Sequence, residues 1–407
     1  MFDDKFTIQI LNQHVSFLIL HIKYLVMRLV LIYFSFVISL IISFNSSTFQ
    51  PQTRVNDGYK HYSGTLDTNM LITFDLLSQN GTITGYYYYG FPVPGDEGFF
   101  QYGKTMAVVG NIEGERFEIR EKINPQSRFI GIFHDNGNMT GKWMRQTYQQ
   151  EVKFELEENY NHGSIKLKSM HHYDYHYVEQ NNITNKNMPK AEIDISFLVP
   201  ENKNNQVADT INFYISQFAS DTTIPFTTYD KLMKEMANSF FNSYQTTTEG
   251  IPNIELLSSF NWQKKYTSEV LYNDNYLLSL RLEKYAYTGG AHGVGIQNNL
   301  VFDLKKNQRI LLNDLFYEGF EPRLNALIDK KLRKLNDLNS DENLQKAGFL
   351  IEEIGFTNNF FLNNDGIVFY YNVYEIAPYA SGPLEIAVPY YELRGILKDQ
   401  GPISWIQ

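Results

Sequence analysis

Short runs of alternating apolar and polar residues follow one another along the first half of the chain. Alternation in residues 71–76 stops at Gln79-Asn80-Gly81 and resumes in residues 82–89. Strand side chains point alternately to opposite faces, and Asn-Gly between two such runs favours a tight turn. This stretch therefore predicts a β-hairpin.

The same pattern recurs further along, with turn residues between the runs. Each run is five to seven residues long, and they occupy residues 105–109, 116–121, 129–133, 139–143, 151–157 and 164–170. About eight short strands at near-regular spacing are typical of an antiparallel barrel or sandwich. We expect such an all-β domain over residues 48–180.

The pattern changes after a polar, Asn-rich stretch at residues 180–189, which is typical of a linker. Apolar residues at helical spacing predict helices over residues 205–219, 229–244 and 321–335. Further alternation predicts strands at residues 192–199, 267–272, 276–287, 297–303, 310–312, 360–362, 367–373 and 384–388. The fold class is thus an α+β module in two parts, residues 190–283 and 284–407, behind an all-β domain.

An uncharged apolar run occupies residues 29–44, directly after Arg28 and before a polar Asn-Ser-Ser sequence. A basic start, an apolar middle and small polar residues beyond are typical of a secretory signal. We expect residues 1–47 to form a signal peptide or a membrane anchor, because the run also approaches spanning length. The protein is then exported to the periplasm, the cell surface or the outer side of a membrane. Met1 and Met27 are both candidate starts.

Composition narrows the classes of partner. The chain of 407 residues has a net charge of -10, and its basic residues are scattered instead of forming a stripe that could neutralise phosphates. Nucleic acid is therefore not an expected partner. Cysteine is absent, which excludes a disulfide, a thiol nucleophile and a lipid-anchoring cysteine. No complete ligand set for a metal is visible, and we expect no metal and no cofactor.

Two sequence blocks in the last part of the chain are distinctive. The first reads Tyr-Ala-Tyr-Thr-Gly-Gly-Ala-His-Gly at residues 285–293 and is followed by Leu-Leu-Asn-Asp-Leu-Phe at residues 311–316. The second covers residues 369–383 and is followed by Ile-Ala-Val-Pro-Tyr-Tyr-Glu-Leu at residues 386–393. In this order, the blocks resemble the RsiV-like C-terminal domain, the extracytoplasmic domain of RsiV-type anti-sigma factors.

The resemblance covers about residues 190–407, since residues 190–283 resemble the companion domain found before this one, including in PdaC-type peptidoglycan deacetylases. It implies a non-catalytic binding or sensor module of the bacterial cell envelope, whose ligand is a protein such as lysozyme or a peptidoglycan or other glycan. Residues 48–180 match it nowhere. Residues 1–28 are short and half apolar, which argues against a sigma-factor-binding segment there.

The two blocks also supply the candidate binding residues. Adjacent glycines permit positive φ and expose backbone N–H groups, and rigid loops that carry tyrosines can bury large area on binding. The candidates are Tyr287, Gly289, Gly290, His292, Tyr374, Pro378, Tyr379 and Gly382. A purely structural role for both loops stays open. The alternative function is an envelope hydrolase that uses His292 with an acid that the sequence does not identify.

One further pattern imitates a catalytic motif. Thr73-Phe74-Asp75 and the later His172 and His176 occur in the order of the metal-binding motifs of polysaccharide deacetylases. However, Leu76 replaces the second acid, and the sequence between lacks the alternation of strand and helix that such a barrel needs. We therefore do not expect deacetylase activity from this set.

Overall fold

The computed structural model describes residues 57–67, 70–92, 100–145, 150–161, 163–178, 188–202, 205–220, 227–251 and 258–404. Residues 53–407 form one compact unit. The segment predicted as a signal peptide or anchor, residues 1–47, lies outside the described residues. Within the described ranges, no helix combines the length and apolarity needed to cross a bilayer.

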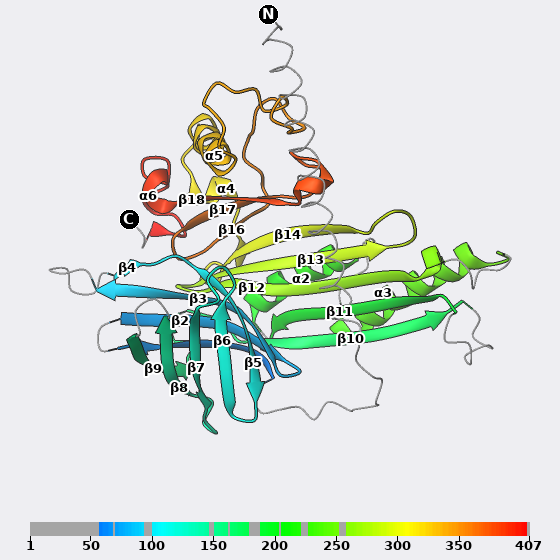
Figure 1. Cartoon of the computed structure of the whole chain (residues 1–407), viewed down its shortest axis with the longest axis horizontal. Coiled ribbons are helices and arrows are strands. Elements are labelled where there is room, and N and C mark those ends of the chain that lie inside the picture. The colour runs from blue at the N-terminus through cyan, green and yellow to red at the C-terminus, as the bar shows by residue number, and fades with distance from the viewer. Residues whose placement is uncertain are drawn as a thin grey trace, which may run out of the picture. The chain divides into compact units, whose positions relative to one another are not determined.

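The first strands of the chain form a closed antiparallel barrel (Figure 1). Around the barrel the strands follow the order β2-β1-β9-β8-β7-β6-β5-β3, and a further pairing of β2 with β3 closes it, while β4 extends β3. The prediction of a barrel or sandwich is confirmed as a barrel. The strands are β1 (Gly58–Leu66), β2 (Met70–Gln79), β3 (Thr82–Pro92), β4 (Phe100–Tyr102), β5 (Met106–Glu113), β6 (Arg116–Glu121), β7 (Ser127–Phe133), β8 (Met139–Arg145) and β9 (Gln150–Glu158).

Aromatic rings fill the barrel interior. Phe129 meets Phe74 and Tyr87 edge-on, each with ring centroids 5.0 Å apart, an arrangement that aromatic pairs favour. The predicted hairpin is confirmed, since Asn80 and Gly81 join β2 to β3 with φ of 53° and 80°. Both residues tolerate the left-handed conformation that this tight turn requires.

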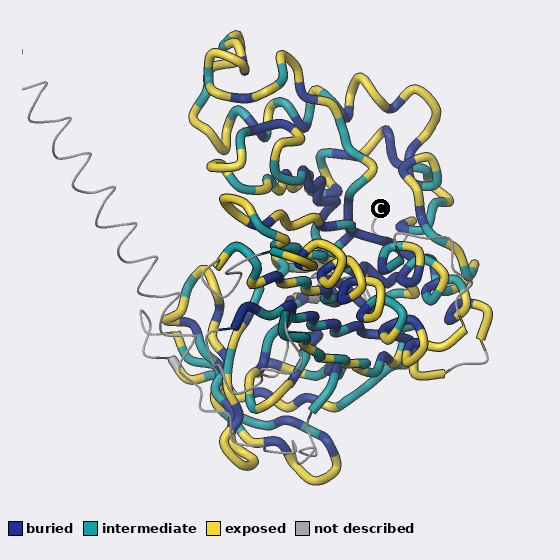
Figure 2. Tube along the Cα trace, turned by 90° about the vertical axis from the view of Figure 1, so that its right-hand side faces the viewer, coloured by how far each residue is buried: buried dark blue, intermediate teal, exposed yellow. Residues whose placement is uncertain are grey.

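A six-stranded sheet follows, in the order β10-β11-β12-β13-β14-β15. Its strands are β10 (Leu167–Tyr177), β11 (Lys190–Pro200), β12 (Trp262–Asp274), β13 (Leu277–Tyr287), β14 (Val294–Asp303) and β15 (Gln308–Arg309). Helices α2 (Gln206–Ala219) and α3 (Tyr229–Thr248) pack on one face, where Ala191, Ile193 and Ile195 of β11 are fully buried. Buried positions run along the central strands, and exposed ones concentrate in the loops (Figure 2).

The closing part of the chain forms a three-stranded antiparallel sheet, in the order β16-β17-β18. It packs with α5, whose bounds agree with the predicted helix, around a core that includes Leu324, Ile328, Phe369 and Ile386. The elements of this part are α4 (Leu312–Leu315), α5 (Glu321–Leu335), β16 (Phe360–Leu362), β17 (Gly366–Tyr371), η3 (Tyr379–Ser381), β18 (Leu384–Pro389) and α6 (Tyr390–Leu393), whereas the short helix η2 (Ser258–Phe260) precedes β12. An α+β fold after the barrel agrees with the prediction.

Strand β10 lies before the predicted linker but pairs with a strand beyond it. Its whole length, from Leu167 to Tyr177, is antiparallel to β11. Residues 179–187 lie outside the described residues. The division into domains at residues 48–180, 190–283 and 284–407 stays a prediction, and any boundary at the linker separates two paired strands.

Side-chain amides connect the six-stranded sheet to the three-stranded sheet. Beyond its short pairing with β15, this edge of β14 has no hydrogen-bonded strand among the described residues, and two asparagines occupy it instead. Asn372 accepts from the backbone N–H of Gln297 at 2.8 Å, and Asn359 accepts from the backbone N–H of Asn299 at 2.8 Å. Both amides also donate to the carbonyl of Gln297. The backbone groups of a buried edge are thereby paired, as burial requires.

Candidate functional site

The two distinctive sequence blocks lie against each other in the fold. The imidazole of His292 stacks on the ring of Tyr379, with centroids 4.2 Å apart and planes at 21°. Tyr374 stands 5.6 Å from Tyr379, between ring centroids. The Tyr379 hydroxyl donates to the Gly293 carbonyl at 3.2 Å. A ladder of three rings, His292, Tyr379 and Tyr374, therefore joins the β13–β14 turn to the loop after β17.

The first side of this site is the turn between β13 and β14. Gly289 and Gly290 adopt φ of 98° and 97°, a conformation that residues with a Cβ rarely take. The Tyr287 hydroxyl donates to the Gly290 carbonyl at 3.1 Å and holds the turn closed. The glycines thus have a structural reason to be there, and they direct the following His292 toward the opposite loop.

The second side is the connection between β17 and β18. Pro378 precedes the short helix η3, and Gly382 ends it at φ of 70° with its N–H donated to the Tyr379 carbonyl. Tyr374 has φ of 65° and is 54% exposed. A bulky residue in the left-handed region is strained and persists only where its surroundings fix it. Here the backbone N–H of Tyr374 binds the Ala377 carbonyl at 3.1 Å.

A groove of about 340 Å³ opens beside the ring ladder. Of the predicted site residues, only Tyr379 lines it, while His292 and Tyr374 contact the ring of Tyr379. Tyr370 also lines the groove. Burial raises the pKa of Tyr370 to about 12, so its hydroxyl stays neutral near pH 7. The other lining residues are Glu283, Lys284, Tyr285, Gly295, Ile296, Gln297, Asn372, Val373 and Pro383.

His292 has the surroundings of a contact residue. It is exposed, its Nδ1 lies 3.0 Å from the Gly293 carbonyl, and its ring face covers Tyr379. Among the described residues, no carboxylate forms a hydrogen bond or an ion pair with it. A catalytic imidazole is normally oriented by a second group that fixes its tautomer. The geometry therefore offers stacking and hydrogen bonding rather than an assembled acid–base pair.

A second set of tyrosines, not predicted as site residues, lies on the sheet face away from α2 and α3. Tyr173 and Tyr175 of β10 are 50% and 46% exposed, and Tyr285 of β13 is 38% exposed. A row of cross-strand partners joins them across four strands: Tyr173, Asp194, Lys265 and Tyr285. The i, i+2 spacing of Tyr173 and Tyr175 is the signal that could have indicated an exposed aromatic stripe.

The residues of the deacetylase-like pattern are dispersed. Asp75 lies on β2 and binds His61 at 2.8 Å. His176 lies on β10 of the six-stranded sheet and stacks on Phe241 of α3, with ring centroids 4.0 Å apart. In the part of the chain that the structure describes, no group of three or more His, Asp or Glu side chains could hold a metal ion.

Comparisons with known proteins place the chain near two families. Residues 184–295 match the family model described as "Deacetylase PdaC", and residues 313–391 match "Protein of unknown function (DUF3298)". A curated relative, the peptidoglycan-N-acetylmuramic acid deacetylase PdaC of Bacillus subtilis (strain 168), is 24% identical over 173 residues. That alignment covers 42% of this chain and 36% of the relative, so the match spans about a third of that protein.

Two solved structures of DUF3298 family proteins are similar to this chain. A DUF3298 family member from Bacteroides fragilis NCTC 9343 is similar with a TM-score of 0.54 and 28% identity, covering 60% of this chain and 97% of its own. A DUF3298 family protein from Pseudomonas aeruginosa PAO1 has a TM-score of 0.41 and 19% identity, covering 57% and 95%. Residues 184–295 and 313–391 are thus similar to the PdaC and DUF3298 families, and the Bacteroides fragilis protein has a similar fold over 60% of this chain.

Proposed function

We propose that this protein is a non-catalytic, exported cell-envelope protein that binds the glycan of peptidoglycan through the groove beside the His292–Tyr379–Tyr374 ladder. One observation carries the proposal: two segments far apart in sequence supply three exposed rings, in which His292 stacks on Tyr379 of the other segment, Tyr374 contacts Tyr379, and Tyr379 lines a groove. Sugar rings present apolar C–H faces, and exposed aromatic rings are suited to pack against them.

The chemistry of the groove supports a glycan more than a small apolar ligand. Its walls combine aromatic surface with the amides of Gln297 and Asn372 and the charges of Glu283 and Lys284. Pockets with a few fixed polar groups on an aromatic lining favour ligands that both stack and hydrogen-bond. The exposed Tyr173, Tyr175 and Tyr285 extend aromatic surface away from the groove, which suits a long polymer.

The comparisons bear on location and on the kind of polymer. The Bacillus subtilis relative acts on peptidoglycan according to its name, and the part shared with this chain is 36% of that protein. The proposal assigns binding, not deacetylation, to the shared part. The resemblance to RsiV-type anti-sigma factors belongs to the same proposal, with lysozyme as the competing partner. The net charge of -10 would suit such a basic protein.

The test is co-sedimentation of the purified protein with insoluble peptidoglycan, alongside a binding assay with lysozyme and an assay for released sugars. Tyr379→Ala should weaken peptidoglycan binding about thirtyfold, since truncation of an aromatic anchor typically costs about 2 kcal/mol or more. Tyr391→Ala is the matched control, because Tyr391 is 65% exposed on α6, outside the ladder and the groove.

Three results would overturn the proposal. The first is full-strength binding by Tyr379→Ala with a normal melting curve. The second is release of product that His292→Ala abolishes, which would establish the hydrolase alternative. The third is binding to lysozyme but not to peptidoglycan. An early melt of Tyr379→Ala would instead assign that ring to the core; Tyr374→Ala, at a more exposed position, then provides the binding test.

A further inference from the structure

A second cleft lies where the barrel meets the turn between β12 and β13. It measures about 490 Å³, which is within the roughly 300–1,000 Å³ of ordinary ligand pockets. Strands β1, β2, β3 and β9 form one wall, and Asp274 and Asn275 form the other. The cleft is separate from the groove beside Tyr379, with which it shares no lining residue.

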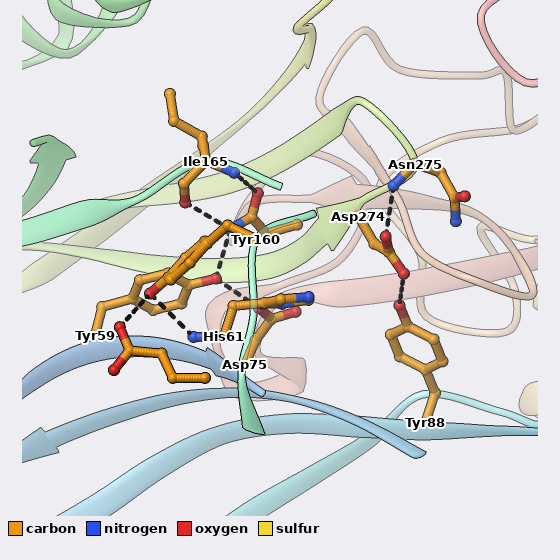
Figure 3. Close-up of polar contacts among 10 residues, drawn as sticks. Tyr59, His61, Asp75, Tyr88, Tyr160, Ile165, Asp274 and Asn275 are labelled. Carbon is orange, nitrogen blue, oxygen red and sulfur yellow. Dashed lines mark hydrogen bonds and ion pairs between the residues drawn. The ribbon is translucent and has the colours of Figure 1, made fainter. Parts of the chain in front are cut away.

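The imidazole in this cleft is buried and fixed. His61 is 2% exposed, and its Nδ1 lies 2.8 Å from the carboxylate of Asp75. Because a carboxylate can only accept, Nδ1 carries the proton and donates. The same carboxylate accepts from the Tyr59 hydroxyl at 2.5 Å, and Tyr59 accepts from the fully buried amide of Asn273 at 2.7 Å. Barrel and sheet residues together hold the ring in one orientation (Figure 3).

The other ring nitrogen of His61 is left for a ligand. No described residue forms a hydrogen bond with Nε2, although the side chain is almost fully buried and lines the cleft. A ring nitrogen without a protein partner, on a residue that lines a cleft, is available to hydrogen-bond a ligand. Figure 3 places His61 between the Tyr59–Asp75 contact and the Asp274–Tyr88 pair, where the Tyr88 hydroxyl donates to Asp274 at 2.7 Å.

The charge of the cleft selects the ligand. Glu155 and Glu157 stand exposed at its edge, and Asp274 lies inside. No lysine or arginine is among the described residues that line it, and the His61–Asp75 pair balances its own charge when protonated. Anions are therefore disfavoured and cations favoured. The hydroxyl groups of Ser63, Thr65 and Thr73 also line the cleft, and hydroxyls can donate to and accept from a polyol.

We propose that this cleft binds an amino sugar, with the ammonium group at the Glu155–Glu157–Asp274 side and a ring hydroxyl at Nε2 of His61. The carboxylates supply charge-assisted hydrogen bonds to the ammonium group, which are stronger than neutral ones. The hydroxyl-bearing strands β1 and β2 then face the rest of the ring. The binding is independent of the Tyr379 groove.

The test is calorimetric titration of the full chain with a β-1,4-linked glucosamine trimer. Two comparison ligands separate the contribution of charge to affinity from that of ring shape. The N-acetylglucosamine trimer has the sugar rings but no ammonium groups. Spermidine has ammonium groups but no sugar ring. Glu157→Gln should weaken the glucosamine trimer at least tenfold without loss of folding, because the side chain is exposed. Glu113→Gln, an exposed acid on barrel strand β5, is the matched control.

His61→Asn tests the buried partner. Asparagine can still donate to Asp75 but presents no nitrogen at the Nε2 position, so it should weaken the trimer while Tyr379→Ala leaves the affinity unchanged. No binding of the glucosamine trimer, equal binding of the acetylated trimer or equal binding of spermidine would each overturn the proposal. Equal affinity in Glu157→Gln and Glu113→Gln would do the same. Loss of peptidoglycan binding alone would bear only on the groove.

Discussion

The side-chain oxygen of Asn359 accepts both N–H groups of Asn299, from the backbone at 2.8 Å and from the side chain at 2.9 Å. One asparagine thus takes the place of a neighbouring strand at the edge of β14. The amide of Asn372 does the same two residues earlier, and Asn372 opens the loop that carries Tyr374 and Tyr379. The position of the candidate groove therefore depends on these two side chains.

Asn359→Ala should lower the free energy of unfolding by about 2–3 kcal/mol, because it leaves the Asn299 N–H groups and one Gln297 carbonyl contact unpaired in a buried setting. Chemical denaturation measures the change. Asn111→Ala, at an exposed position of β5, should stay within about 0.5 kcal/mol of the parent. Equal effects of the two substitutions would contradict the strand-replacing role.

Tyr59 and Tyr62 give a second, paired prediction. The Tyr59 hydroxyl donates to Asp75 and accepts from Asn273, so Tyr59→Phe should cost about 1–3 kcal/mol by removing both of these buried hydrogen bonds. The Tyr62 hydroxyl is buried, and none of the described residues forms a hydrogen bond with it. Tyr62→Phe removes a desolvated group and should be neutral or stabilising. Thermal melting of both variants checks the opposite signs, and a costly Tyr62→Phe would refute them.

The His61–Asp75 pair should make stability depend on pH. Burial lowers the pKa of His61, but the carboxylates of Asp75 and Asp274 outweigh burial and leave that pKa above its usual 6.5. The folded state then binds the proton more tightly than the unfolded state. The stabilisation is full below pH 6.5 and is lost as pH rises through the folded pKa. The free energy of unfolding should therefore decline on the alkaline side of pH 6.5.

His61→Asn should flatten this decline, as measured by denaturation at several pH values. His171 is the control, since its pKa is also raised, by a hydrogen bond to Asp194. Its side chain is 47% exposed, so solvent screens the pair and His171→Asn should change the pH profile little. Asp274, whose pKa burial raises, acts in the same direction but from pH 3.8 upward. A decline that persists in His61→Asn would exclude His61 as its source.

Cleavage within residues 181–187 should not separate the chain into two free pieces. Strand β10 on one side of the cut is paired along its whole length, Leu167 to Tyr177, with β11 on the other side. A protease site inserted there should give two bands on a denaturing gel but one peak on gel filtration. Fragments that elute separately and melt independently would support the simpler division at the linker.

Single turns and helices of this fold can be predicted from nearby residues, whereas the pairing of distant strands cannot. The position of the Asn80-Gly81 turn and the bounds of α5 match the prediction because turn chemistry and helical periodicity act over a few residues. The pairing of β1 with β9, the first and last barrel strands in the chain, joins residues as far apart as Tyr62 and Glu158. Alternation indicates a strand but carries no information about which distant strand is its partner.

The candidate sites divide in the same way. Sequence indicated the segments of His292 and Tyr379 separately, but their stacking depends on how the β17–β18 loop packs on β14. The His61–Asp75 pair was missed, although the two are directly opposite each other in the β1–β2 ladder. Once that hairpin register is assumed, the pair follows, since cross-strand neighbours on one face are in contact.

Side chains on the outer surface of the barrel also belong to the hydrophobic cores of the two sheets that follow it in the chain. Tyr59 packs in the core under α2 and α3, and Tyr88 packs in the core of the three-stranded sheet. In evolutionary terms, this barrel cannot be gained or lost without changes in the residues that it packs against. A descendant that lost it by recombination would uncover apolar surface around Leu271 and Tyr272 and leave the amide of Asn273 without Tyr59. Gain or loss of the barrel therefore requires compensating substitutions in β12. Relatives with the barrel and relatives without it should differ in the sequence of this strand.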